Sequence, residues 1–360
     1  IFAHAITTDA WRNSLDHYQE FVIIVALDLK IEAELPVLSG QRPATNNNAG
    51  ANYRIAVLNG SAKPDYLDAV NRTEHQNELL AQHKLSSYYP QGLLFTDQEL
   101  QTMPAETAKL VREWFPTFYV RGFDYLQYLF QQNIPFYLLL IGIIVSGGLF
   151  AKELAHQRAH ANWLRLQGEG WGTQIAVQFL TIGLTTVEIV LLPLLLTTLV
   201  TGCLNGFGSL QFPVINVTYQ NTLNSFAEDF TTSGQLIFHS IALLLLLIAL
   251  VTAFNIVTAL IAKNAWITTT IVLLVTASAL IMPPIPWLPL SFFNVWKIAS
   301  GTIAQSTALP EMQLASGIRV IMVWLLGLLA AAAIGSLNFS HHSSFKASSK
   351  ADAPENERSY

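Results

Sequence analysis

The chain has 360 residues, of which 52% are hydrophobic and only 12% are charged, whereas an average soluble protein is about one quarter charged. This composition excludes a disordered protein, and a net charge of -5 gives no basic surface for nucleic acid. Cys203 is the only cysteine, so the chain forms no internal disulfide and no paired-thiol redox site. The composition favours a membrane protein over a cytosolic globule.

Charge is distributed unevenly along the chain. Residues 1–133 contain 10 basic and 15 acidic residues, whereas the 204 residues from 134 to 337 contain only six of each. This pattern predicts an extracytoplasmic, water-exposed domain over 1–133 and a membrane domain over 134–337. Residues 338–360 then form a polar tail.

The first of these regions is predicted to be mainly helical, with an irregular middle over 35–60 that is rich in Pro, Gly and Asn. Residues 65–84 are polar and compatible with a helix, Thr96 to Glu99 fits a capping box, and Pro104 suits a helix start. The apolar run Phe21 to Leu27 is too short to cross a bilayer, so we expect a core segment there.

Five stretches of the membrane part are long and apolar enough to be membrane-crossing helices, which need about 20 residues. They run over about 134–151, 174–200, 236–262, 265–282 and 319–336. Only two residues separate the third stretch from the fourth, which predicts a tight helical hairpin. The expected fold class is therefore an all-α, polytopic helical bundle with a mainly helical extracytoplasmic domain.

The basic residues of the loops predict the orientation. Residues 152–173, the turn at Lys263 and the tail 338–360 are the basic segments, and the positive-inside rule makes their side cytoplasmic. Residues 1–133 then lie outside the cell membrane. Because the chain begins at Ile1 without a visible signal peptide, we expect a missing N-terminal segment that supplies a first span, giving six in the intact protein.

Two features inside the membrane region each have two interpretations. Glu188 lies in the middle of the second stretch, where it either faces a translocation path or subunit seam, or is a packed, protonated residue without a transport role. Met282 to Trp287 breaks the fourth stretch and is either a re-entrant element or an interfacial turn. We favour the re-entrant element because residues 288–298 are apolar again.

Sequence motifs for catalysis are missing from the chain. No lysine follows a glycine, as a phosphate-binding P-loop requires, and no zinc-protease, serine-hydrolase or Cys-x-x-Cys motif occurs. His156, His160 and the pair His341–His342 are interpreted as solvated interfacial residues rather than metal ligands. We therefore expect no catalytic residues, no metal and no cofactor, and any ATPase activity on a partner chain.

The segment from Gly147 to Leu180 resembles permeases of type-2 ABC exporters, in which a Glu at the inner end of a span precedes an amphipathic coupling helix. Glu153 matches that Glu, and residues 162–167 match the end of the coupling segment, although Gly168 replaces the usual proline. Near-helical spacing places Trp163 and Leu166 on one apolar ridge. Trp163, Leu164 and Leu166 are therefore the expected coupling residues, together with Glu153.

The resemblance implies an exporter built from two permease subunits, identical or different, over two separate ATP-binding cassette ATPase subunits. It also implies that closure of the ATPases pushes on the segment from Glu153 to Gln167. The sequence does not identify the exported substrate, and four classes remain open: lipid, peptide, antibiotic and polysaccharide. Two alternatives are a membrane-anchored receptor or sensor whose extracytoplasmic domain reads a ligand, and a membrane-embedded enzyme.

Overall fold

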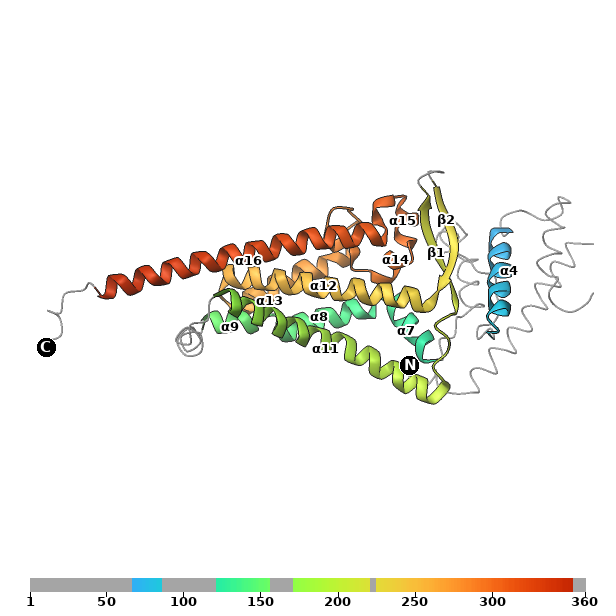
Figure 1. Ribbon diagram of the computed structural model, residues 1–360, viewed down its shortest axis with the longest axis horizontal. Helices are drawn as coiled ribbons and strands as arrows, with labels where there is room; N and C mark the ends of the chain where they lie inside the picture. The colour runs from blue at the N-terminus through green and yellow to red at the C-terminus, as the bar shows by residue number, and fades with distance from the viewer. Residues whose placement is uncertain (1–66, 86–120, 156–170, 221–224, 352–360) are drawn as a thin grey trace, which may run out of the picture. The chain divides into compact units, whose positions relative to one another are not determined.

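The structure, a computed structural model, describes residues 67–85, 121–155, 171–220 and 225–351 (Figure 1). These residues are mostly helical, as predicted. The chain divides into two compact units, which are described separately. The first contains Ile1–Tyr125, Thr201–Ile215 and Asp229–Gly234, and the second contains the remaining residues. The predicted elements at Phe21 to Leu27, at Thr96 to Glu99 and after Pro104 lie outside the described residues.

The polar helix predicted over 65–84 is present in the first unit as α4 (Leu67–Gln82). Gln76 Nε2 donates a hydrogen bond to the carbonyl oxygen of Pro213 at 3.0 Å, and the ring of His75 lies 5.4 Å from that of Phe230. Pro213 begins the first strand of a β-hairpin and Phe230 lies near the end of the second strand. Helix α4 therefore contacts both strands at the end of the hairpin that is connected to the helices.

A two-stranded sheet departs from the all-α prediction. It consists of β1 (Pro213–Gln220) and β2 (Ser225–Thr232), drawn as the paired arrows of Figure 1. A four-residue connection can only join antiparallel strands. The stretch Val214 to Tyr219, between the second and third predicted spans, is rich in β-branched and aromatic residues, which favour a strand.

The start of α7 (Gly122–Gln131) is held by a glycine-containing turn of the first unit. The N–H groups of Gly122 and Phe123 donate to the carbonyl oxygens of Gly206 and Phe207, at 3.1 and 2.9 Å. Gly208 has a φ of +80°, and a Cβ there would lie 3.3 Å from Asp124 Oδ2. The turn therefore packs closely over Asp124, which is only 3% exposed.

This burial removes water from the Asp124 carboxyl group and raises its pKa from 3.8 to about 6, while the charge of Arg121 acts in the lowering direction.

Asp124→Asn cannot ionise, so the variant should be more stable than the wild type at pH 7, by up to about 3 kcal/mol, and the difference should shrink toward pH 4. The folded protein favours the protonated form of Asp124. The stabilisation of the folded state by this proton is therefore fully present below pH 4 and is lost as the pH rises through 6. Thermal unfolding of both proteins from pH 4 to 7 measures the difference; one that does not vary with pH contradicts the assignment.

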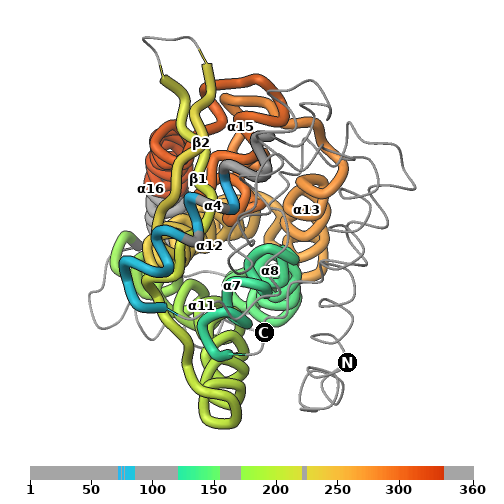
Figure 2. Tube along the Cα trace, turned by 90° about the vertical axis from the view of Figure 1, so that its right-hand side faces the viewer, coloured from blue at the N-terminus to red at the C-terminus, as the bar shows by residue number. Residues whose placement is uncertain are grey.

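The apolar helices of the second unit lie side by side, as Figures 1 and 2 show. They are α8 (Ile134–Ser146), which continues after a two-residue break as α9 (Leu149–Ala155), then α11 (Trp171–Asn205), α12 (Ser233–Ala262), α13 (Ala265–Ala277) and α16 (Leu314–Ala351). Four helical segments in the described residues are long and apolar enough to cross a membrane: Ile134–Leu154, Gly172–Asn205, Ser233–Ala262 and Leu314–Gly335. They correspond to the first, second, third and fifth predicted spans.

The fourth predicted span is shorter than expected. Helix α13 and the 3-10 turn η2 (Ser278–Leu280) together cover Ala265–Leu280, about 24 Å of helix against a hydrocarbon core of about 30 Å. The helix ends before Pro283 and Pro284, whose missing N–H groups cannot continue it. A total of five spans therefore remains a prediction.

The predicted tight hairpin between α12 and α13 is present. Lys263 has a φ of +51°, and Asn264 Oδ1 accepts hydrogen bonds from the N–H groups of Trp266 and Ile267, at 3.0 and 3.3 Å. This N-cap satisfies two of the donors that a helix start leaves free. The two-residue turn Lys263–Asn264 therefore reverses the chain, and the Asn264 side chain bonds the N–H groups of Trp266 and Ile267 at the start of α13.

A compact segment joins α13 to α16. It contains η3 (Pro289–Phe292), α14 (Val295–Ala299), α15 (Thr302–Thr307) and η4 (Pro310–Met312). Phe292 is fully buried, and a Cβ on Gly317 of α16 would lie 2.6 Å from its ring. The ring of Phe293 packs on Phe136 of α8, with centroids 5.5 Å apart. The apolar run 288–298 is thus largely enclosed by the bundle.

Candidate functional site

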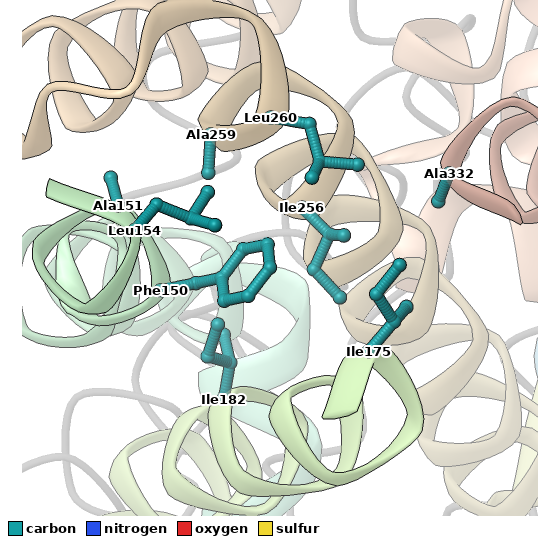
Figure 3. Close-up of a cluster of buried hydrophobic side chains, with 9 residues drawn as sticks. All are labelled: Phe150, Ala151, Leu154, Ile175, Ile182, Ile256, Ala259, Leu260 and Ala332. Atoms are coloured by element: carbon teal, nitrogen blue, oxygen red, sulfur yellow. The ribbon is translucent and has the colours of Figure 1, made fainter. Parts of the chain in front are cut away.

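Helix α9 carries the predicted coupling residue Glu153 and is anchored by its apolar face. Phe150, Ala151 and Leu154 are buried, while Glu153 is exposed on the other face. The buried face joins a cluster with residues of α11, α12 and α16, drawn in Figure 3: Ile175, Ile182, Ile256, Ala259, Leu260 and Ala332. Figure 3 shows Phe150 at the centre of this cluster. This packing holds α9 against α11, α12 and α16.

Glu153 is bonded directly to the next helix. Its Oε2 accepts a short hydrogen bond from Gln178 Nε2 of α11, and Gln178 is only 8% exposed. Helix α9 ends at Ala155 and α11 begins at Trp171. The Glu153–Gln178 contact therefore connects the two helices that flank residues 156–170, so both ends of that segment are held together.

The other expected coupling residues, Trp163, Leu164 and Leu166, lie outside the described residues, as do His156 and His160. The structure therefore describes the two helices that flank the predicted coupling segment, α9 and α11. A displacement of the segment would reach α9 and α11 together, because the Glu153–Gln178 hydrogen bond and the buried cluster join them.

Buried polar groups also connect α8 to α11, in addition to the contact between α9 and α11. Ser146 Oγ donates to the carbonyl oxygen of Gly142 at 2.7 Å and lies 3.1 Å from Thr186 Oγ1. A Cβ on Gly142 would lie 3.0 Å from Thr186 Cγ2, so the glycine allows the two helices to approach closely. The spacing of Gly142 and Ser146 is the small-xxx-small pattern of membrane helix packing, a signal that sequence reasoning could have used.

The break between α8 and α9 adjoins polar side chains from two further helices. A Cβ on Gly147 would lie 3.2 Å from Asn255 Nδ2 of α12 and 3.3 Å from Thr269 Oγ1 of α13. Asn255 is 2% exposed, and its Oδ1 has no hydrogen-bond partner among the described residues. Sequence reasoning did not single out these residues, since one Asn in an apolar stretch does not show which neighbour it meets.

Glu188 is exposed on α11 and has neither a hydrogen bond nor an ion pair among the described residues. Leu184, Leu192 and Leu195 of the same helix are also more than half exposed. Only 22% of the apolar part of α11 is buried within this chain. Glu188 is thus not packed against the other described helices, and the helix face around it is apolar.

Among the described residues, no group of three or more His, Cys, Asp or Glu side chains is placed to hold a metal ion. The chain matches no protein-family model, no curated protein and no solved structure. Its function is therefore inferred from its own residues and from the pattern of its Gly147 to Leu180 segment.

Removing the Glu153 carboxylate should loosen the contact between α9 and α11. Glu153→Ala leaves the nearly buried Gln178 amide without its acceptor, which costs roughly 1–3 kcal/mol, so the variant should unfold at a lower temperature in detergent. Glu153→Gln is the matched control, because its side-chain carbonyl can still accept the hydrogen bond. Thermal unfolding monitored by size-exclusion chromatography compares them, and equal losses in both variants would contradict this role for the hydrogen bond.

Proposed function

We propose that the chain is the membrane-spanning permease subunit of an ATP-binding cassette exporter, using ATP hydrolysed on a separate subunit. The observation that carries this proposal is the Glu153–Gln178 contact at the base of residues 156–170. The segment has the apolar pattern of a coupling helix, and the contact joins both of its flanking helices. The four long apolar helices of the bundle support the membrane location.

In this proposal, ATP-driven closure of the ATPase subunits displaces residues 156–170. The displacement passes through the Glu153–Gln178 hydrogen bond to α9 and α11 at the same time. Gly147 and Gly148 separate α9 from α8, so α9 can change its angle while α8 stays straight. The result is a change in packing between the inner ends of the helices, which opens or closes a path.

A second permease subunit, identical or different, covers the Glu188 face of α11. A charge in the middle of a bilayer costs a few kcal/mol or more unless it is paired, protonated or wet. Glu188 is exposed on the isolated chain, in the middle of a helix long enough to cross the membrane. Contact with a partner subunit or with the aqueous path between the subunits would avoid the cost of exposing it to lipid.

The orientation follows from the basic loops. Residues 152–173, the turn at Lys263 and the tail lie in the cytoplasm, where the ATPase subunits are. Residues 1–133 lie outside the cell membrane, and α13 with η2 is the additional crossing that makes the number of spans odd. The basic residues in these three segments, against a single lysine in the opposite loops, support this arrangement.

Trp163→Ala tests the contact with the ATPase. A Trp on the apolar ridge of the coupling segment would be the anchor of a helix-in-groove contact, and its loss typically costs about 2 kcal/mol, or roughly 30-fold in affinity. We expect the variant to insert normally and to lose the ATPase during purification. The measurement is co-purification of the tagged permease with a co-expressed ATP-binding cassette ATPase partner.

Trp266→Ala is the matched control for this experiment. Trp266 is 84% exposed at the α12–α13 turn, on the same proposed side of the membrane, so it tests the effect of losing an interfacial Trp anchor. Equal ATPase recovery with wild-type and Trp163→Ala permease would contradict the coupling role. Recovery reduced equally by Trp163→Ala and Trp266→Ala would show lipid anchoring instead.

A further inference from the structure

Polar side chains of three other helices adjoin the C-terminal end of α8, where the chain breaks at Gly147 before α9 begins. Ser146 Oγ of α8 lies 3.1 Å from Thr186 Oγ1 of α11. A Cβ on Gly147 would lie 3.2 Å from Asn255 Nδ2 of α12 and 3.3 Å from Thr269 Oγ1 of α13. Ser146, Thr186 and Asn255 are each at most 2% exposed. A group of polar atoms is therefore enclosed within the bundle of apolar helices.

The hydroxyl hydrogens of this group are directed to the backbones of their own helices. Ser146, Thr186 and Thr269 each donate to the carbonyl oxygen four residues earlier, at 2.7, 2.8 and 2.9 Å. A hydroxyl group has one hydrogen to donate and two lone pairs with which to accept. Ser146 and Thr186 thus have two hydrogens for three contacts, so at least one contact brings two acceptors together. These side chains offer oxygen lone pairs to a ligand rather than hydrogens.

Two further acceptors at the break have no hydrogen-bond partner among the described residues. One is the carbonyl oxygen of Gly147, a buried residue whose N–H donates to the carbonyl oxygen of Ile143. The other is Asn255 Oδ1. The Asn255 Nδ2 makes no hydrogen bond with the described residues either, so the amide can turn over and present Oδ1 to the break without losing one. The C-terminal end of α8 adds the partial negative charge of a helix end. The group therefore has more acceptors than donors.

We propose that this group of oxygens binds a monovalent alkali cation, sodium or potassium, between α8, α11, α12 and α13. Carbonyl and hydroxyl oxygens are the ligands that membrane transporters use for such ions at interrupted helices. Calcium and magnesium sites use carboxylates, and this group contains none. An anion needs several donors, and among these side chains only the Asn255 amide supplies any. The site lies within one subunit, so its existence does not depend on the proposed ATPase partner.

Thermal unfolding of the full chain in detergent tests the proposal. It is measured over a range of sodium chloride or potassium chloride concentrations, with N-methylglucamine chloride keeping the ionic strength constant. A ligand that binds only the folded state raises the unfolding temperature with the logarithm of its concentration, once this exceeds the Kd. We expect this rise with at least one of the two metal ions. An unfolding temperature that depends on neither ion at constant ionic strength overturns the proposal, in favour of a bound water molecule.

Thr186→Val and Thr198→Val form a matched pair that locates the site. Both hydroxyl groups donate to the carbonyl oxygen four residues earlier in α11, and both side chains are buried, but Thr198 lies about 18 Å further along the helix. Valine keeps the shape of threonine and removes its oxygen. We expect Thr186→Val to weaken cation binding about tenfold or more, because it removes an uncharged ligand of a charged group, and Thr198→Val to leave the affinity unchanged.

Two more variants separate loss of the site from a folding defect. Thr186→Ser restores the oxygen and should bind the cation as the wild type does. Thr269→Val removes a different oxygen of the group, from a less buried position, and should weaken binding as Thr186→Val does. Wild-type affinity in both Thr186→Val and Thr269→Val, or an equal loss in Thr186→Val and Thr198→Val, overturns the assignment of the site to the α8 break.

Discussion

A bilayer offers no water to backbone N–H and C=O groups, and this constraint accounts for most features of the second unit. The long apolar stretches become helices because only a helix bonds all of these groups within one segment. Where the chain leaves a helix, a cap or prolines reduce the number of unbonded N–H groups. Asn264 caps the turn between α12 and α13, and prolines remove donors from the segment after α13.

The long helices could be predicted from the sequence because hydropathy and length decide them locally. The C-terminal end of α13 was harder to predict, since residues up to Met282 are mostly apolar and the first prolines follow only at Pro283 and Pro284. The hairpin of β1 and β2 was missed for a different reason. Its strands are short, and the β-branched residues of β1 stand in adjacent pairs, Val214–Ile215 and Val217–Thr218, rather than in the alternation that predicts a strand.

The candidate site was predictable only in part. Glu153 stood out because a Glu at the inner end of a span precedes an amphipathic segment. Gln178 did not, since its importance depends on the packing of α11 against α9, 25 residues away in the sequence. Asn255 is a similar case: this lone amide of α12 lies beside the break between α8 and α9, where Gly147 leaves space for it. Such pairings are tertiary, and neither periodicity nor composition encodes them.

The central claim is that the bundle crosses the membrane and leaves residues 1–133 and the tail on opposite sides. Single cysteines at Asn47 and Ser349, in a Cys203→Ser background, can be treated with a membrane-impermeant maleimide on intact cells. Labelling of the cysteine at position 47, with position 349 labelled only after the membrane is permeabilised, is the expected result. The reverse pattern, or labelling of both positions in intact cells, would contradict the proposed topology.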